Sequence, residues 1–191
     1  LLNELLEADL LRGIGRAYGM EVYVKKNNGK LTGWVSYTLA RSERQVVGIN
    51  DGNWYPNRFD RKHNLYIVSQ YQFNQKWEFA ANFVFSTGTP ATFYTGQYSV
   101  QGYVIPDAGS NARNNVRNPA YHRLDVSATY TRKKTKTFES FWVFSCYNVY
   151  NRRNPFSIYF STNYKDLGQN EAIRYSVIGS IVPAVSYNFK F

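Results

Sequence analysis

The stretch VIGSIVPAVSYNFKF, residues 177–191, decides the fold class because two kinds of side chain alternate along it. The odd positions from 185 to 191 are Val, Tyr, Phe and Phe, whereas Ser, Asn and Lys stand between them. Successive side chains of a β-strand point to opposite faces. The pattern therefore predicts a strand with one apolar face and one small or polar face.

The same alternation recurs upstream. Between residues 76 and 86, Trp77, Phe79, Phe83 and Phe85 alternate with polar residues such as Glu78 and Asn82. Similar patterns occur in 17–26, 31–40, 63–74 and 121–131, whereas 137–149 is apolar on both faces and its parity stays open. We predict an all-β protein with seven strands, at about 16–27, 30–43, 61–74, 76–95, 120–133, 137–162 and 173–191.

The connections between these predicted strands alternate in length. NNGK, NQK and KTKT are short polar turns, whereas the stretches at 45–60, 96–119 and 163–172 are long. Long strands with short turns at one end and long loops at the other are typical of a transmembrane antiparallel β-barrel. Single-chain bacterial barrels have an even number of strands, so the odd number predicts that the rest of the wall lies outside this sequence.

Composition agrees with two environments alternating along each strand. The net charge is +10 and mean hydropathy is −0.48, yet 18% of the residues are aromatic. No apolar run reaches the roughly 18 residues of a membrane-spanning helix. The single cysteine, Cys146, excludes an intrachain disulfide and a cysteine-based metal cluster. Residues 1–12 lack the basic region of a signal peptide and have leucines spaced for a short amphipathic helix.

Several phrases together resemble the C-terminal barrel half of TonB-dependent receptors of the Bacteroidetes type. They are GIGRAYGMEVYVKKNNGKLTGWVSYTLARSER, WYPNRFDRKHNL, FSTGTPATFYTGQY, NPAYHRLDVS and YNVYNRRNPFSIYF, and the resemblance covers about residues 12–191. The middle residue of GIG at 13–15 departs from the acidic residue expected there. The resemblance implies a 22-stranded barrel filled by an N-terminal plug, of which this chain would supply the last seven strands. Residues 1–15 would then end an extracellular loop, and 16–191 would form barrel strands and loops.

The resemblance also implies a function and partners. The protein would be an outer-membrane importer of a nutrient ligand such as a siderophore, glycan or peptide, with no enzymatic activity and no cofactor. Its partners would be the lipid bilayer, the remaining strands and plug, TonB acting through the plug, the outer-membrane assembly machinery and, in some members, a surface lipoprotein. The C-terminus would be periplasmic. The alternating residues Val185, Tyr187, Phe189 and Phe191 match the terminal strand that the assembly machinery reads by edge pairing; a lipid-facing strand with an interfacial aromatic belt is a compatible interpretation.

Basic residues gather in or beside the long connections. They are Arg58, Arg61, Lys62, Arg113, Arg117, Arg152 and Arg153. They are candidates for contact with anionic ligands or lipopolysaccharide phosphates, although ordinary solvated loop charge is the favoured explanation. Nucleic-acid binding is disfavoured because the aromatic residues alternate on one strand face.

Catalysis has little support in the sequence. His122 and Asp125, three residues apart on a predicted strand, fall on opposite faces, and GIGRAYG lacks the spacing of a dinucleotide-binding loop. Two other classes stay open: a small closed outer-membrane barrel or β-rich adhesin, which needs an eighth strand, and an outer-membrane hydrolase, which needs paired acidic or His–Asp groups near the rim.

Overall fold

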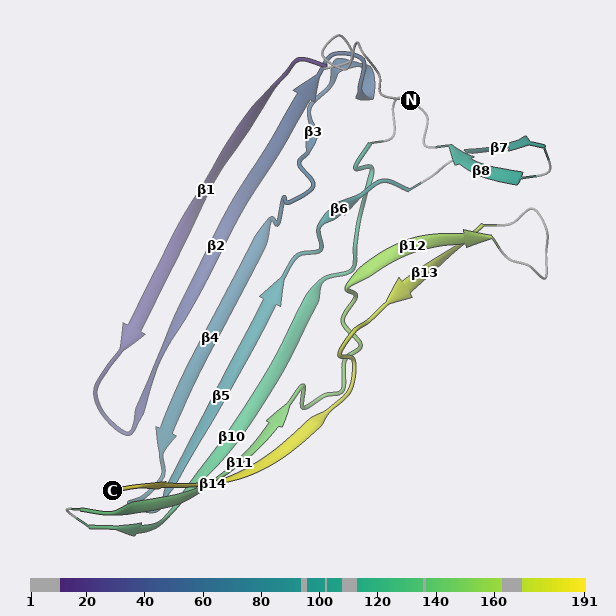
Figure 1. The fold of residues 1–191 in the computed structure, drawn as a ribbon. Helices are drawn as coiled ribbons and strands as arrows, with labels where there is room; N and C mark the ends of the chain where they lie inside the picture. The colour runs from purple at the N-terminus through teal and green to yellow at the C-terminus, as the bar shows by residue number, and fades with distance from the viewer. Residues whose placement is uncertain (1–10, 94–95, 102, 108–112, 136, 163–169) are drawn as a thin grey trace.

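The computed structural model describes residues 11–93, 96–101, 103–107, 113–135, 137–162 and 170–191. Its main feature is one antiparallel sheet in the order β1-β2-β4-β5-β10-β11-β14, with β3 paired to β2 (Figure 1). The strands of this sheet are β1 (Gly13–Lys26), β2 (Leu31–Val46), β3 (Tyr55–Pro56), β4 (His63–Gln72), β5 (Trp77–Ser86), β10 (Tyr121–Lys134), β11 (Glu139–Tyr147) and β14 (Val182–Lys190). The predicted all-β class and antiparallel arrangement are confirmed.

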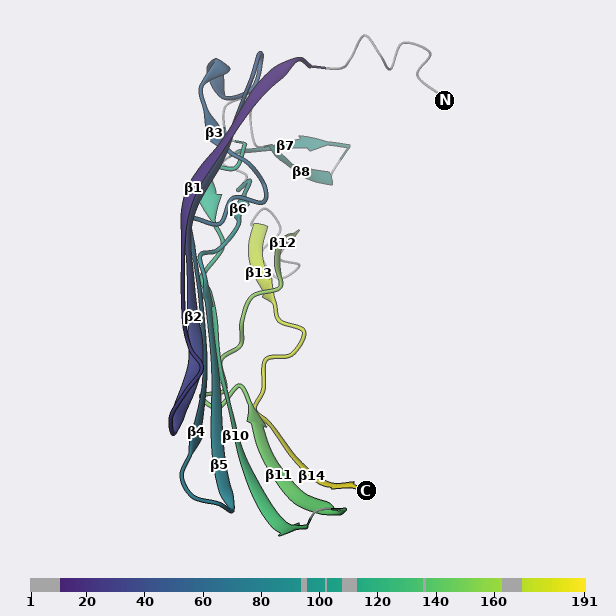
Figure 2. The ribbon, with the colours of Figure 1, turned by 90° about the vertical axis from the view of Figure 1, so that its left-hand side faces the viewer.

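Shorter elements occupy the long connections. They are the 3-10 helix η1 (Asn50–Gly52) and the strands β6 (Pro90–Ala91), β7 (Gly96–Val100), β8 (Tyr103–Asp107), β9 (Val116–Arg117), β12 (Ser157–Thr162) and β13 (Asn170–Tyr175). β7 pairs with β8, β6 with β9, and β12 with β13. Figure 2 shows the hairpins β7–β8 and β12–β13 on the same side of the curved main sheet.

The sheet is open within the described residues. β1 and β14 are the two ends of the strand order, and no pairing between them appears in the part of the chain that the structure describes. The described residues therefore form no closed barrel, and within them each end strand keeps one edge without a strand partner. No helix among the described residues has the length and apolar character to cross a membrane.

Two predicted strands are each divided into two, and the first division has an identifiable cause. The strand predicted at 137–162 ends at Tyr147 and resumes as β12, and the one predicted at 173–191 is divided between β13 and β14. The first break coincides with Asn148 and Asn151, both at φ 55°, a left-handed conformation that asparagine tolerates better than most residues. The apolar character of both faces in 137–149 hid this break.

Other predicted elements also differ from the structure. The strand predicted at 76–95 stops at Ser86, and the loop predicted at 96–119 contains the hairpin β7–β8. β1 begins at Gly13, so residues 13–15 belong to a strand and not to the expected loop. The helix predicted at 1–12 lies mostly outside the described residues, and Leu11 and Arg12 are not helical.

Gly33 allows β2 and β4 to approach closely. Its φ is 149°, and a Cβ built on it would lie 2.1 Å from the carbonyl oxygen of Val68 on β4. Only glycine fits this position without displacing the backbone of the neighbouring strand.

Candidate functional site

One face of the main sheet is apolar from β1 to β14, because the strand register places apolar residues of neighbouring strands opposite each other. Residues that lie opposite each other in an antiparallel pair point to the same face. One cross-strand row consists of Val24, Val35, Ile67, Phe83 and Leu124, and another of Leu31, Tyr71, Phe79, Ala128, Phe144 and Val185. We call this surface the apolar face. From Trp77 to Phe85 it follows about 27 Å of β5, at about 3.4 Å per residue.

In the part of the chain that the structure describes, apolar side chains are mostly exposed and the buried side chains are mostly polar, the reverse of the usual pattern in a water-soluble domain. Among the described residues, Tyr55 is the one buried hydrophobic side chain, whereas Glu43, Asp60, Ser86, Ser140, Asn148 and Asn154 are buried. Residues of the apolar face, including Met20, Val24, Phe79 and Val185, are exposed. An exposed apolar surface of this extent marks a surface that contacts another apolar phase or partner.

An aromatic row crosses the apolar face at the end that carries the short turns. It consists of Trp77 on β5, Tyr130 on β10, Trp142 on β11 and Tyr187 on β14, each opposite the next in register. Ring centroids are 4.9 Å apart for Trp77–Tyr130 and 4.8 Å apart for Trp142–Tyr187. Such amphipathic rings are enriched where a membrane meets water.

Small residues leave a shallow depression in the apolar face, next to the aromatic row on its side away from the short turns. Ser69, Ala81, Val126 and Cys146 line a shallow depression of about 560 Å³ together with larger neighbours such as Tyr71 and Phe144. The depression is part of the apolar face and brings no charged side chain with it.

A charged cluster borders the apolar face at the end of the sheet that carries the long connections. Arg16 lies opposite Glu43, and Arg41 is two residues before Glu43 on β2, so all three are on this face beyond Met20 and Leu39. The Glu43 side chain is 3% exposed and pairs with Arg16 at 2.6 Å and Arg41 at 2.5 Å. We call Arg16, Arg41 and Glu43 the arginine rim.

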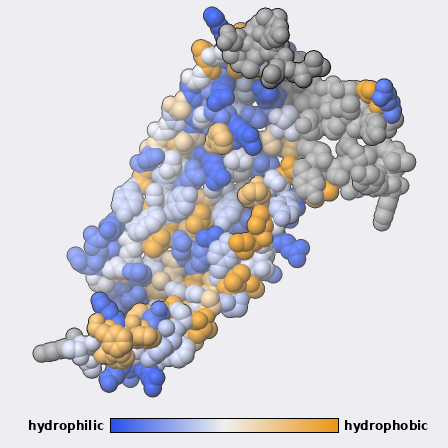
Figure 3. Space-filling view, in the orientation of Figure 1, coloured by the Kyte–Doolittle hydropathy of each residue, from blue (hydrophilic) through white to orange (hydrophobic). Residues whose placement is uncertain are grey.

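The opposite face of the sheet is more polar and has its own hollow. Figure 3, in the orientation of Figure 1, shows hydrophilic residues frequent toward the end with the long connections. Arg123 pairs with Asp125 at 2.9 Å and donates to the hydroxyl oxygens of Tyr121 and Tyr147, both at 2.9 Å. A depression of about 480 Å³ lies beside them, lined by residues that include Arg61, Tyr66 and Phe156.

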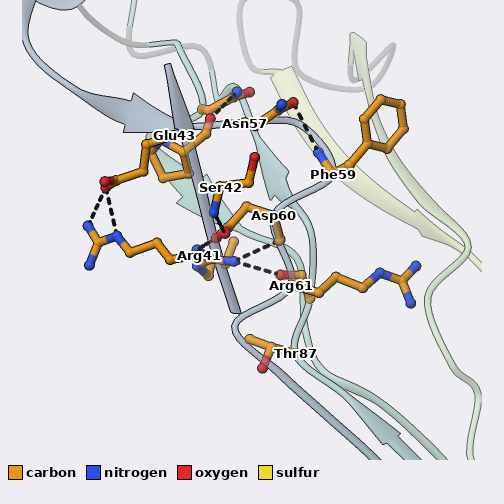
Figure 4. A network of polar contacts seen from close by, with 12 residues as sticks. Arg41, Ser42, Glu43, Asn57, Phe59, Asp60, Arg61 and Thr87 are labelled. Atoms are coloured by element: carbon orange, nitrogen blue, oxygen red, sulfur yellow. Dashed lines mark hydrogen bonds and ion pairs between the residues drawn. The ribbon is translucent and has the colours of Figure 1, made fainter. Parts of the chain in front are cut away.

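Buried Asp60 organises the connection between β2 and β4 (Figure 4). Its carboxylate accepts a hydrogen bond from the backbone N–H of Ser42 at 2.6 Å and forms an ion pair with Arg117. Arg117 also donates to the carbonyl oxygens of Asp60 and Gly88. Further along, Asn50 bonds the backbone of Arg113. These contacts tie the connections 47–62 and 113–118 together.

The seven basic residues predicted as ligand contacts do not form one site. Arg117 and Arg152 are half-buried, and Arg152 donates to Asn154 and to the carbonyl of Ala120, so both hold loops in place. Arg61 donates to Ser86, and Arg58 lies over the Phe59 ring at 6.0 Å. The other three predicted contacts, Lys62, Arg113 and Arg153, are exposed.

The histidines belong to aromatic contacts. Nδ1 of His63 lies 2.8 Å from the Tyr37 hydroxyl, and Nδ1 of His122 lies 2.9 Å from the Tyr150 hydroxyl. Burial raises the pKa of Tyr150, which favours its protonated hydroxyl. His122 is opposite Phe85 and Asp125 is opposite Asn82, which confirms that they occupy opposite faces. The described residues contain no group of His, Cys, Asp and Glu that could hold a metal ion.

The proposed assembly residues lie along an end strand. Val185, Tyr187 and Phe189 are on β14, whose partner is β11, and all three are exposed on the apolar face. Phe191 follows the strand and is 87% exposed, with its ring 5.7 Å from Phe138 and 5.5 Å from Phe189. Within the described residues the second edge of β14 has no strand partner, and recognition by edge pairing needs such an edge.

The arginine rim and the buried polar residues were missed by sequence reasoning. A signal for the rim was present: the apolar alternation of β2 stops at Leu39, and Arg41 and Glu43 then occupy the next two positions of the same face. Nothing local marks Asp60, since its partner Arg117 is 57 residues away. Comparisons with protein-family models, curated proteins and solved structures found no match to this chain.

Proposed function

We propose that this chain is part of the wall of a β-barrel in the bacterial outer membrane, with its apolar face against lipid. The supporting observation is the inverted burial: exposed apolar residues line one face in register across the sheet, while the buried side chains of the described residues are mostly polar. The aromatic row and the arginine rim bound this face at its two ends, as interfacial residues bound the apolar band of about 25 Å in such barrels.

In this proposal the unpaired edges of β1 and β14 join further strands of the same barrel. Open sheet edges are not tolerated in lipid because their N–H and C=O groups would lack hydrogen-bond partners. The short turns and Phe191 lie at one end of the sheet (Figure 1); a periplasmic C-terminus puts them in the periplasm. The long connections then face outward.

The barrel belongs, in our proposal, to a TonB-dependent receptor that imports a nutrient ligand. The support is the set of sequence phrases that resemble this family, together with a seven-strand path that is open at both edges. The chain would supply wall and outer loops, and the plug, TonB, assembly machinery and any surface lipoprotein would be its partners. No step of chemistry on the ligand is required.

Uptake by whole cells tests the importer. Radiolabelled siderophores, glycans and peptides are offered to cells with the protein, without it, and with it but without TonB. We expect saturable uptake of one ligand class that disappears in both deletions. Uptake of every class at unchanged rates in both deletions would contradict the importer.

The mass of the native protein distinguishes the receptor from the alternative, a small closed outer-membrane barrel or adhesin. A receptor predicts a parent about four times the 22.2 kDa of this chain. A native mass of 22.2 kDa would instead support the alternative.

A further inference from the structure

The arginine rim lies where a lipid headgroup would meet the apolar face. Arg41 and Arg16 occupy the same face as Met20 and Leu39, two and four residue pairs farther along the ladder between β1 and β2. Tyr18 lies directly opposite Arg41 on the same face and is exposed. A molecule lying along the apolar face therefore reaches two guanidinium groups immediately beyond its apolar part.

Glu43 fixes the orientation of both guanidinium groups. Nε and Nη2 of Arg16 point to Oε2 of Glu43 at 2.8 and 2.6 Å, and Nε and Nη2 of Arg41 point to Oε1 at 2.7 and 2.5 Å. The Trp54 ring supports Arg16, whose Cζ lies 4.2 Å from the ring centroid. Each guanidinium group is held in place on one side, and for Nη1 of each the described residues provide no hydrogen-bond partner.

The remaining donors and charge favour an anion. Two arginines and one carboxylate carry a net charge of +1, and the arginine side chains are 48% and 52% exposed, whereas Glu43 is buried. A pre-oriented guanidinium group loses little conformational entropy when it binds an oxyanion, and its fork matches phosphate geometry.

We infer that Arg16 and Arg41 bind the phosphate group of a membrane lipid whose acyl chains lie along the apolar face. The inference rests on the proposed membrane location. The occupant is a phosphorylated lipid, not free phosphate, because the cluster continues an exposed apolar surface. The loop arginines, by contrast, are spread over separate connections, and two of them hold loop contacts.

The test compares lipid binding by the full-length protein purified in a non-ionic detergent. The probes are dioctanoyl phosphatidic acid, dioctanoylglycerol, which lacks the phosphate, and inorganic phosphate; bound lipid is counted by native mass spectrometry. The variants are Arg16→Gln/Arg41→Gln, the charge-preserving Arg16→Lys/Arg41→Lys, and the control Arg44→Gln/Arg174→Gln, at two exposed arginines outside the rim. In parallel, brominated lipid is used to quench the fluorescence of Trp142 in a chain that keeps only this tryptophan.

We expect the wild-type protein and the control to bind phosphatidic acid at least about tenfold more tightly than dioctanoylglycerol, as charge-assisted hydrogen bonds predict. The glutamine pair should lose this preference, and the lysine pair should keep only part of it. If the glutamine pair does not fold, the lysine pair alone decides, and an unchanged preference in it would overturn the role of the fork.

Three results would overturn the inference. The first is an equal preference in wild type and the glutamine pair, which would leave the rim as a structural ion-pair cluster. The second is displacement of the lipid by inorganic phosphate at equal concentration. The third is the absence of Trp142 quenching, which would also overturn the membrane location; quenching of Trp142 without a phosphate preference would overturn this inference alone.

Discussion

Trp142 of β11 and Tyr187 of β14 lie directly opposite each other, with ring centroids 4.8 Å apart. The pair joins the aromatic row at the short-turn end to the last strand of the sheet. The exposed residues Phe189 and Phe191 continue this aromatic surface to the end of the sequence. The apolar face and the proposed assembly edge therefore meet on β14.

Replacement of Phe191 by Asp should impair insertion much more than stability. Phe191 is 87% exposed, so the folded sheet loses little buried area. The free energy of unfolding of inserted molecules should change by the small amount typical of surface sites, within about 0.5 kcal/mol. Their melting temperature should therefore shift little. Recognition of the terminal strand depends on few side chains, so the inserted amount should fall severalfold. Quantitative blotting of outer membranes and thermal melts of the inserted fraction measure the two effects. Lys190→Gln is the control, and equal insertion of Phe191→Asp and wild type would remove the assembly role.

Asp60→Ala should loosen the connections on both sides of the ion pair. The substitution leaves the Ser42 N–H without its acceptor and removes the carboxylate partner of the partly buried Arg117, which keeps its hydrogen bonds to two backbone carbonyl oxygens. The cost of a lost hydrogen bond to a charged group is about 1.5–3 kcal/mol, and the one-third exposure of Arg117 favours the lower end. Hydrogen exchange of residues 55–62 and 113–118 should accelerate, whereas Glu21→Ala, at an exposed position of β1, should change neither segment. Unchanged exchange in Asp60→Ala would show that other contacts hold the connections.

Substitutions of Asn148 should lower the stability of the protein through the loss of its side-chain hydrogen bonds and through its backbone conformation. Its amide donates to the carbonyls of Arg152 and Ser180 and accepts from the N–H of Arg152, and its φ is 55°. Asn148→Ala loses these hydrogen bonds and places Ala in a left-handed conformation, at a combined cost of about 2–4 kcal/mol. Asn148→Gly loses the same bonds without the conformational cost. Chemical unfolding should rank stability as wild type, Gly, then Ala; equal stability of Gly and Ala would remove the backbone contribution.

The two ends of the sheet should differ in access from outside the cell. Val47 lies in the long connection after β2, and Asn28 lies in the short turn between β1 and β2; both are exposed. In a Cys146→Ser background, a membrane-impermeant maleimide should label Val47→Cys on intact cells and label Asn28→Cys only after the outer membrane is permeabilised. The reverse pattern would invert the proposed orientation.

The sequence predicted the strands whose two faces differ in polarity and missed the features that depend on distant residues. Regular alternation located β1, β2, β4, β5 and β10 to within a few residues, apart from the early end of β5 at Ser86. The break at Asn148 escaped because 137–149 is apolar on both faces, although NVYNRRNP contains the Asn and Pro residues typical of turns. The Asp60–Arg117 pair and the burial of Glu43 depend on how loops and strands meet in space, which periodicity does not encode.

The central claim, that the apolar face contacts lipid, is tested most directly by nitroxide scanning of β5 in membranes. Trp77, Phe79, Phe83 and Phe85 lie on the apolar face, whereas Glu78 and Asn82 lie on the opposite face. Spin labels at these six positions are compared for relaxation by oxygen, which concentrates in lipid, and by a water-soluble nickel complex. We predict high oxygen accessibility at the four odd-numbered positions and low accessibility at 78 and 82. Oxygen protection of the odd positions, with exposure of position 82, would contradict the account.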